Sequence, residues 1–313
     1  GRADAPKLGI FEAGTHRAVH IPRCLVHHPV VNRVAAQVRD ALARHRVPTY
    51  SDAGHAGLAR YLQVAVERET ERAQVTLVTN DTSVSQVAPV LAELATLIGD
   101  TLQGLWWNGN AERTNTILGP YWEHVAGERY VQDLSGNARI FYPPSAFGQS
   151  NLDLAMQLAA EVRALVEPGQ RVAELYAGVG AIGLGLAESA SALHLNELGE
   201  GSLEGLNAGI AALAEEHRRK VSVHAGTAGD CASVVEAADI VIVDPPRKGL
   251  DPALLAELCR RPPARLVYVS CDVGSFERDC EPLQRALPLR SLAAYDLFPH
   301  TEHLETLAVF ERD

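Results

Sequence analysis

The stretch that decides the fold is VAELYAGVGAIG, Val172–Gly183, where an apolar run leads into a turn with Gly178 and Gly180. Glycine tolerates the backbone angles of a tight strand-to-helix turn and lets a ligand approach the backbone closely. Glu197 ends the next predicted strand and follows Gly178 by 19 residues, a spacing typical of carboxylates that bind ribose hydroxyls. The pattern predicts a nucleoside-type ligand, with a plain packing turn as the alternative. Because Gly183 stands at the third glycine position of dinucleotide-binding turns, NAD stays open at this point.

Downstream of this turn, apolar strands and helical stretches alternate to the end of the chain. Five apolar strands separated by helices predict a mainly parallel α/β sheet, Rossmann-like, with helices on both faces. The pattern changes near Ile140, so we expect a smaller α+β domain at residues 1–140 and the α/β domain at 141–313.

The upstream part has its own strand and helix signals. Residues 8–21 predict a hairpin, and residues 61–81 predict two strands around a polar turn. Pro29 suits a first helical turn and opens an amphipathic helix to about Ala43. The apolar face of that helix is expected to contain Val31, Val34, Val38 and Leu42.

Two polar motifs follow the ends of later predicted strands. In VIVDPPRKGLD, Val241–Asp251, two prolines make a rigid lip that holds Asp244 at the sheet edge. LVYVSC places Cys271 at the end of the fifth strand. Active sites of such sheets lie at this edge, so we expect Asp244 to face a ligand and Cys271 to be a nucleophile in an electropositive, partly open pocket. The plainer alternatives are a capped turn and a small buried side chain.

The C-terminal segment FPHTEHLE, Phe298–Glu305, supplies two histidines and two glutamates. His300 and His303 lack a third metal ligand at a suitable spacing, so we expect no zinc site. A general base is the better use of this segment. FGQSN, Phe147–Asn151, is by itself only an amide-rich helix start.

Composition limits the class of protein. With 313 residues, 47% hydrophobic and 21% charged, the chain is a globular protein of about two domains. It has no apolar run of roughly 18–20 residues, so we expect no membrane span. Five cysteines without a CxxC pair argue against a disulfide framework and favour the cytoplasm. The net charge of −11 argues against a large nucleic-acid footprint but does not exclude a local basic patch.

Taken in order, the motifs resemble those of the S-adenosylmethionine-dependent RNA uracil-C5 methyltransferases. That family has F-x-Q-x-N, D/E-L-Y-x-G-x-G, an acidic strand end, D-P-P-R-x-G-L/A, S-C-N/D and F-P-H/Y-T-x-H-L/M-E. This chain has FGQSN, ELYAGVG, NE, DPPRKGL, SCD and FPHTEHLE in the same order. The resemblance is strong over residues 141–313, and residues 9–24 and 112–119 also look like that family's central domain.

The resemblance implies a class I methyltransferase fold, S-adenosylmethionine as cofactor and a uridine of tRNA or rRNA as substrate. The N-terminal domain would then contact RNA. The implied roles are Cys271 as nucleophile, Glu305 as proton acceptor, and Gln149, Tyr176, Gly178, Glu197 and Asp244 around the cofactor.

The implied chemistry needs both a nucleophile and a base. C5 of uracil is a poor nucleophile until a thiolate adds at C6, and a base must later remove the C5 proton so that the thiol can leave. The target base must also leave its stack. We expect the Glu305 carboxylate to accept that proton without a large pKa shift. Asp244 fits two roles, a contact with the cofactor or a hydrogen bond to the extruded base.

The sequence also departs from the family. Many members carry a β-barrel RNA-binding (TRAM) domain ahead of these motifs, and this sequence has none, although its start at Gly1 rather than Met leaves an upstream segment open. Only Cys24 stands at a position for a cluster ligand, so we expect no iron–sulfur cluster. A small-molecule methyltransferase or a non-catalytic RNA-binding relative are the alternatives, and the retained Cys271 and Glu305 argue against the second. We infer no metal and no obligate protein partner.

Overall fold

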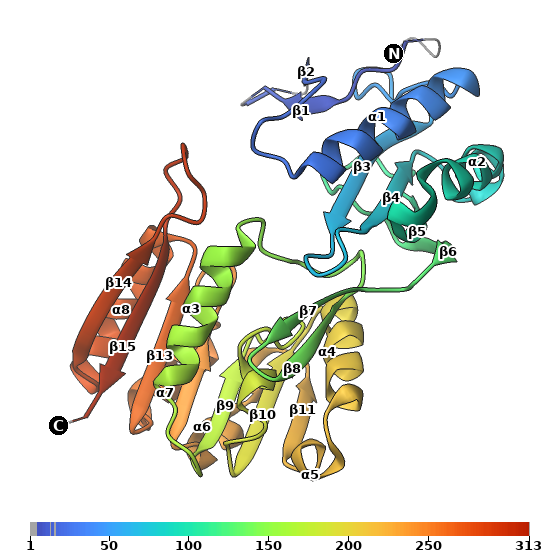
Figure 1. Ribbon diagram of the computed structural model, residues 1–313. Coiled ribbons are helices and arrows are strands. Elements are labelled where there is room, and N and C mark those ends of the chain that lie inside the picture. Colours follow the sequence, from blue (N-terminus) through green and yellow to red (C-terminus); the bar gives the residue numbers. More distant parts are fainter. Residues whose placement is uncertain (1–4, 13, 16, 313) are drawn as a thin grey trace. The chain divides into compact units, whose positions relative to one another are not determined.

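The computed structural model describes residues 5–12, 14–15 and 17–312 (Figure 1). The chain divides into two units, residues 1–133 and 134–313. This boundary precedes the expected one after residue 140, because the strand Ala138–Tyr142 (β8) places Ala138 and Ile140 in the core of the second unit.

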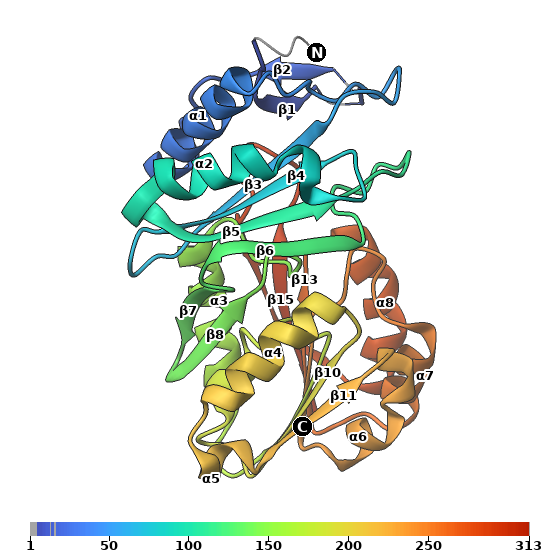
Figure 2. The same cartoon turned by 90° about the vertical axis from the view of Figure 1, so that its right-hand side faces the viewer.

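The first unit contains a four-stranded sheet in the order β3-β4-β5-β6 and a separate two-stranded hairpin, β1-β2. Helices α1 and α2 pack on one face of the sheet (Figure 2). In the described ranges of the chain, no helix is long and apolar enough to cross a membrane. The elements are β1 (Gly9–Phe11), β2 (Ala18–His20), α1 (Pro29–Arg44), β3 (Ala59–Val66), β4 (Ala73–Thr79), α2 (Ala88–Ile98), β5 (Leu102–Gly109) and β6 (Tyr121–Gly127).

The buried face of α1 differs in one position from the predicted face. The helix buries Val30 rather than Val31, and the buried positions then recur every three to four residues at Val34 and Val38. Val31 lies one helical step around the axis and is only half-buried. Pro29 stands at the first turn as expected.

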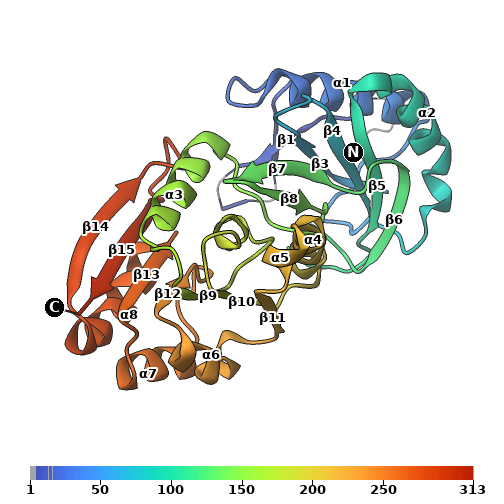
Figure 3. The ribbon, with the colours of Figure 1, turned by 60° about the horizontal axis from the view of Figure 1, so that its bottom comes forward.

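The second unit is built on a seven-stranded sheet in the order β11-β10-β9-β12-β13-β15-β14 (Figure 3). The first five strands in this order are parallel, and β15 runs antiparallel to both β13 and β14. The strands are β9 (Arg171–Leu175), β10 (Ala192–Glu197), β11 (Val221–Ala225), β12 (Ile240–Val243), β13 (Arg265–Ser270), β14 (Leu289–Tyr295) and β15 (Glu305–Glu311).

Helices cover both faces of this sheet, as predicted. One core lies beneath α3 and α4, and the other lies between the sheet and α6, α7 and α8 (Figure 3). The helices and the remaining strand are β7 (Val131–Ser135), α3 (Leu152–Ala164), α4 (Glu200–Ala212), α5 (Glu215–Arg218), α6 (Ala232–Ala237), α7 (Pro252–Arg260) and α8 (Val273–Ala286).

The segment after β9 departs from the predicted order of elements. The helix expected after the glycine turn is a single 3-10 turn, Gly183–Leu186. The sequence GAIGLGL, Gly180–Leu186, has three glycines. Glycine disfavours a helix because its backbone loses more conformational freedom on ordering, so only one turn forms.

Candidate active site at the carboxyl edge of the sheet

The strand order reverses between β9 and β12, which are neighbours in the sheet. Chain connections leave this point in opposite directions, and ligands of open α/β sheets bind in the resulting crevice at the carboxyl ends of the strands. The glycine turn follows β9, and the Asp-Pro-Pro segment follows β12. Both motifs therefore border the position where this fold places a ligand.

Asp244, Cys271 and Glu305 lie at the ends of three neighbouring strands, Asp244 directly after β12, Cys271 directly after β13 and Glu305 at the start of β15. Side chains alternate between the two faces along a strand, so residues two positions apart share a face. The residues two positions away are Ile242, Val269 and Leu307, and all three belong to the core beneath α3 and α4. The three polar side chains therefore point to the α3 side of the sheet, at the carboxyl ends of β12 and β13.

Strand register places Cys271 beside Glu305. Ser270 of β13 and Thr306 of β15 form the last pair of the antiparallel ladder, and Cys271 and Glu305 are the next residues outward on the two chains. The charge of Glu305 acts on the Cys271 thiol, which places the two side chains near each other. Glu305 is 1% exposed, and its Oε2 has no hydrogen-bond partner among the described residues. A thiol and an unpaired buried carboxyl thus face the same space.

The electrostatics of this group differ from the sequence-based expectation. Burial, together with the charge of Asp244, raises the pKa of Glu305 to about 8, so the expectation of an unshifted carboxylate is wrong for the unliganded protein. Burial raises the pKa of Asp244 to about 7. Burial and the charges of Glu305 and Asp244 also raise the pKa of the Cys271 thiol, and the Arg247 guanidinium acts against them. The surroundings of the thiol are thus more acidic than electropositive.

The glycine turn is tied to Glu197 by backbone hydrogen bonds. The Gly178 amide donates to Glu197 Oε2 at 2.8 Å, and the amides of Leu198 and Gly199 donate to Oε1. Gly178 has a φ of +58°, which disfavours any residue with a Cβ, and a Cβ built there meets nothing within 4 Å. The turn therefore has open space above it and a fixed carboxylate at its side.

These residues fit a nucleoside-containing cofactor. Glu197 Oε2 accepts one backbone hydrogen bond and keeps capacity for a ribose hydroxyl. Gln149, just before α3, has a buried Oε1 with no partner in the described part of the chain, so it can accept a hydrogen bond from a ligand. Asn151 caps α3 by accepting from the Leu154 amide at 3.4 Å, which fixes the start of the helix beyond Gln149.

Tyr176 takes up a backbone conformation that is rare for a side-chain-bearing residue, with a φ of +63°. Its hydroxyl accepts a hydrogen bond from the Asp251 amide at 2.8 Å, at the start of α7, and its ring packs with the core beneath α6–α8. The Tyr176 side chain thus holds the start of α7, and its strained backbone leads into the glycine turn.

Glu174 is a buried group to which the sequence motif assigned no role. It is 1% exposed in β9 and accepts a hydrogen bond from the Gly183 amide. Burial, with the charge of Asp244, raises its pKa to about 8, and the charge of Arg163 acts in the opposite direction. Arg163 donates to Ser135 Oγ, which in turn donates to the Ala181 carbonyl. Glu174, Arg163 and Ser135 thus support the glycine turn from within the core. In the sequence, the feature that could have identified Glu174 is an acidic residue inside an otherwise apolar strand.

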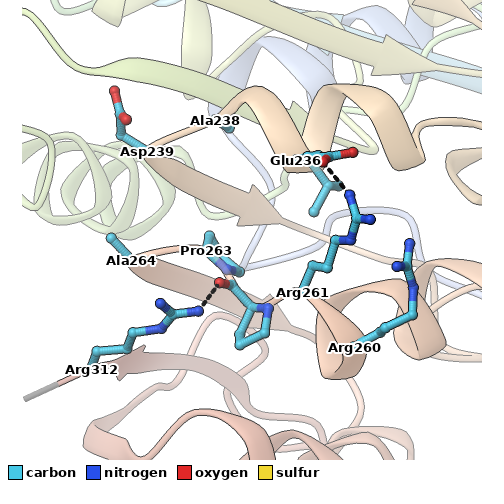
Figure 4. Close-up of a pocket in the computed structure, with 10 residues that line it drawn as sticks. Glu236, Ala238, Asp239, Arg260, Arg261, Pro263, Ala264 and Arg312 are labelled. Atoms are coloured by element: carbon cyan, nitrogen blue, oxygen red, sulfur yellow. Dashed lines mark hydrogen bonds and ion pairs between the residues drawn. The ribbon is translucent and has the colours of Figure 1, made fainter.

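A pocket of about 430 Å³ lies at the opposite edge of the sheet (Figure 4). Its three arginines are already engaged: Arg260 with Glu257, Arg261 with Glu236, and Arg312 with the Pro262 carbonyl. These contacts join α6, α7 and the strand ends. The pocket lies at the wrong edge for a ligand of this fold and has no free charged group among the described residues that line it.

The described residues include no group of three or more His, Cys, Asp or Glu side chains that could hold a metal ion. All five cysteines are free thiols. The backbone amide and carbonyl of Cys24 form hydrogen bonds with the Asn32 side chain. Cys231 and Cys280 are buried in the core beneath α6–α8.

Known proteins resemble this chain in sequence and in structure. The model of the family described as tRNA (Uracil-5-)-methyltransferase matches residues 234–313. An uncharacterized RNA methyltransferase of Protochlamydia amoebophila is 36% identical over 319 residues, covering 100% of this chain and 83% of the relative. An uncharacterized RNA methyltransferase of Geobacter sulfurreducens is 29% identical over 97% of this chain, which spans 62% of that relative's length.

A solved structure shares the fold over most of the chain. The Pyrococcus abyssi tRNA (uracil-54, C5)-methyltransferase in complex with S-adenosyl-L-homocysteine has a TM-score of 0.79 and 25% identity, covering 94% of this chain and 70% of that one. The match confirms the predicted Rossmann-like α/β fold. Together with the order of the sequence motifs and the Protochlamydia relative, it leads to one conclusion: the chain belongs to the RNA uracil-C5 methyltransferase family.

Proposed function

We propose that this protein transfers a methyl group from S-adenosylmethionine to C5 of a uridine in tRNA or rRNA, through a covalent bond between Cys271 and C6. The observation that carries the proposal is the end of the β13–β15 ladder, where Cys271 and Glu305 directly follow the last pair and the charge of Asp244 acts on both. A nucleophile and a proton acceptor in one place are what this reaction needs.

The Cys271 thiolate adds to C6 of the uracil, and the electron pair of the C5–C6 double bond moves to C5. When bound, S-adenosylmethionine would supply an electrophilic methyl group to C5, with the sulfur keeping the electron pair of the broken methyl–sulfur bond and leaving as a neutral thioether. The half-buried thiol lies at the strand end, where an extruded base can reach it. Arg247 favours the thiolate over the thiol by its positive charge.

Glu305 then removes the C5 proton. The electron pair of the broken C–H bond restores the C5–C6 double bond, and the C6–S bond breaks to release the Cys271 thiolate. A buried carboxyl with a raised pKa is a stronger base once ionised than an exposed one. His300 or water is the alternative acceptor, and the glutamate is favoured because it lies near the thiol.

For the cofactor, we propose that Glu197 binds the ribose hydroxyls and that the backbone at Gly178 approaches the nucleoside closely. Gln149 Oε1 accepts a further hydrogen bond, and Tyr176 contributes through its backbone. The strand that Asp244 follows, β12, lies between β9, which leads into the glycine turn, and β13, which leads to Cys271. We therefore place the Asp244 carboxyl against the cofactor. A hydrogen bond to the extruded base is the alternative role.

The first unit, whose sequence resembles the family's central domain, would add contacts to the RNA. We place the reaction in the cytoplasm, since free thiols persist in a reducing compartment.

Transfer of a labelled methyl group from S-adenosylmethionine to bulk tRNA, bulk rRNA and free uridine tests the proposal. We expect label in one RNA class, located at uridine C5 after digestion to nucleosides. Label in free uridine alone would favour the small-molecule alternative. Binding of RNA without any transfer would favour a non-catalytic relative.

A further inference from the structure

The loop between β12 and α7 carries Arg247, the cation whose charge favours the Cys271 thiolate. Arg247 and Lys248 are exposed, but the next two residues, Gly249 and Leu250, are buried. The Gly249 amide donates to the Pro246 carbonyl at 2.8 Å, so Arg247 lies inside a closed turn. The position of its guanidinium therefore depends on what holds the far end of that turn.

Helix α8 holds that end through two consecutive residues. Asp279 Oδ2 accepts a hydrogen bond from the Leu250 amide at 2.7 Å, and Arg278 donates to the Lys248 carbonyl at 2.6 Å. Arg278 also donates to Asp279 Oδ1 at 3.2 Å, which joins the two contacts into one unit. Asp279 is 1% exposed, so its hydrogen bonds are shielded from water.

The approach of α8 to the loop is close enough to require glycine. Gly249 has a φ of +84°, and a Cβ built on it would lie 2.4 Å from Asp279 Oδ2 and 2.3 Å from Arg278 Nη2. Tyr268 of β13 fixes the same carboxylate from the other side by donating to Oδ2 at 2.9 Å. Asp279 thus contacts both the sheet and the loop, and its contacts with the loop do not pass through Tyr268.

The same helix begins next to the nucleophile. Asp272 caps α8 by accepting from the Ser275 amide at 2.7 Å, directly after Cys271. The charge of Arg247 acts on both Cys271 and Asp272. One rigid element therefore joins the residue that carries the thiol to the loop that carries its cation.

We propose that Asp279 is a positioning residue, which through the backbone of residues 248–250 holds the Arg247 guanidinium beside the Cys271 thiol. This inference rests on the proposed function in one respect, namely that the Cys271 thiolate is the nucleophile of the reaction. Asp279 touches neither substrate nor cofactor in this role.

The test is the titration of Cys271 in the full chain, without RNA or cofactor. Iodoacetamide alkylates the thiolate, and mass spectrometry of the Cys271 peptide gives the rate at each pH. A change in the access of iodoacetamide to Cys271 multiplies the alkylation rate by the same factor at every pH. The midpoint of the plot of rate against pH reports the pKa of the thiol.

Asp279→Asn separates positioning from a direct charge effect by sign. Removing a negative charge would by itself favour the thiolate and lower the midpoint. Losing the position of Arg247 raises the midpoint instead. We expect a rise that cuts the thiolate fraction near neutral pH roughly threefold, equal to half a pKa unit.

Arg247→Ala should give a similar rise, and the double variant with Asp279→Asn should add little to it, because Asp279 acts through Arg247. Tyr268→Phe is the matched control, since it removes a hydrogen bond to Asp279 and leaves the loop contacts in place. It should lower the melting temperature and leave the midpoint unchanged. If Asp279→Asn does not fold, Arg278→Lys keeps the charge on the exposed side of α8 but weakens the contact with the Lys248 carbonyl, and it should give a smaller rise.

A midpoint that falls or stays constant in Asp279→Asn, or additive shifts in the double variant, would overturn the proposal. Because the titration needs no methyl transfer, absence of methyltransferase activity would count against the proposed function alone.

Discussion

At the scale of single residues, the proposed chemistry depends on the thiol at the end of β13. Cys271→Ala removes the only nucleophile that the proposal uses and leaves the glycine turn untouched. We expect methyl transfer to RNA to fall by roughly 10³-fold or more, with S-adenosylmethionine affinity almost unchanged. Cys259→Ala, the same change on α7, should keep full activity. Turnover of more than a few per cent in Cys271→Ala would exclude the covalent mechanism.

Glu197 gives a second residue-scale prediction, which concerns cofactor binding. Glu197→Ala removes the carboxylate that fixes Gly178 and is proposed to bind the ribose. We expect calorimetry to show S-adenosylmethionine binding weakened by about 1–3 kcal/mol, the scale of a lost hydrogen bond to a charged group. Glu200→Ala in the first turn of α4 is the control. Binding of NAD in place of S-adenosylmethionine would contradict the assignment.

The positions of the site residues follow from the sequence more readily than their ionisation does. Strand ends were recognisable, and the carboxyl edge of a parallel sheet brings strand ends together. The raised pKa of Glu305 has a different origin, because the burial and the charge of Asp244 that cause it arise only in the packed fold. The antiparallel strand that brings Glu305 near Cys271 was likewise not apparent from local sequence.

At the scale of elements, the two ends of the glycine turn need glycine for different reasons. Gly183→Ala would place a Cβ 2.0 Å from Glu174 Oε2, so we expect a loss of about 1–3 kcal/mol in unfolding free energy from overpacking. Gly178→Ala meets open space and costs about 1–2 kcal/mol from its left-handed backbone alone.

Gly183→Ala should have the larger effect on stability, and Gly178→Ala should have the larger effect on cofactor affinity. The Gly178 methyl group would fill space proposed for the nucleoside, so Gly178→Ala should weaken S-adenosylmethionine more than Gly183→Ala does. Urea denaturation and calorimetry measure the two rankings. The same ranking in both experiments would argue against a ligand above Gly178.

Element boundaries show where local sequence was insufficient. Apolar runs identified β9, β10, β12 and β13 because these inner strands are mostly buried beneath helices. They did not identify β14, whose burial pattern is mostly exposed at the sheet edge. The predicted domain boundary, after residue 140, was too late for a related reason. The strand β8 is short, and its residues Ala138 and Ile140 belong to the core beneath α3 and α4.

At the scale of the whole molecule, stability should fall as pH rises from about 5 to 8. The folded pKa values of Asp244, Glu174 and Glu305, about 7, 8 and 8, lie above their ordinary values. The folded state therefore binds more protons than the unfolded state in this window, so the free energy of unfolding falls with pH until these carboxyls ionise.

Urea denaturation at pH 5.5, 7 and 8.5 measures this slope, and Glu305→Gln should make it shallower. A free energy of unfolding that rises over this range would show that these carboxyls are not buried as protonated groups.

The most direct test of the central claim is a denaturing gel of Glu305→Gln after incubation with RNA and methyl-labelled S-adenosylmethionine. The glutamine keeps the shape of the side chain and cannot remove the C5 proton. Cys271 should therefore add to the uracil, the methyl group should transfer, and the reaction should stop there. The account predicts a labelled protein–RNA band that survives denaturation and disappears in Cys271→Ala/Glu305→Gln. Near-normal turnover of Glu305→Gln with no such band would contradict it.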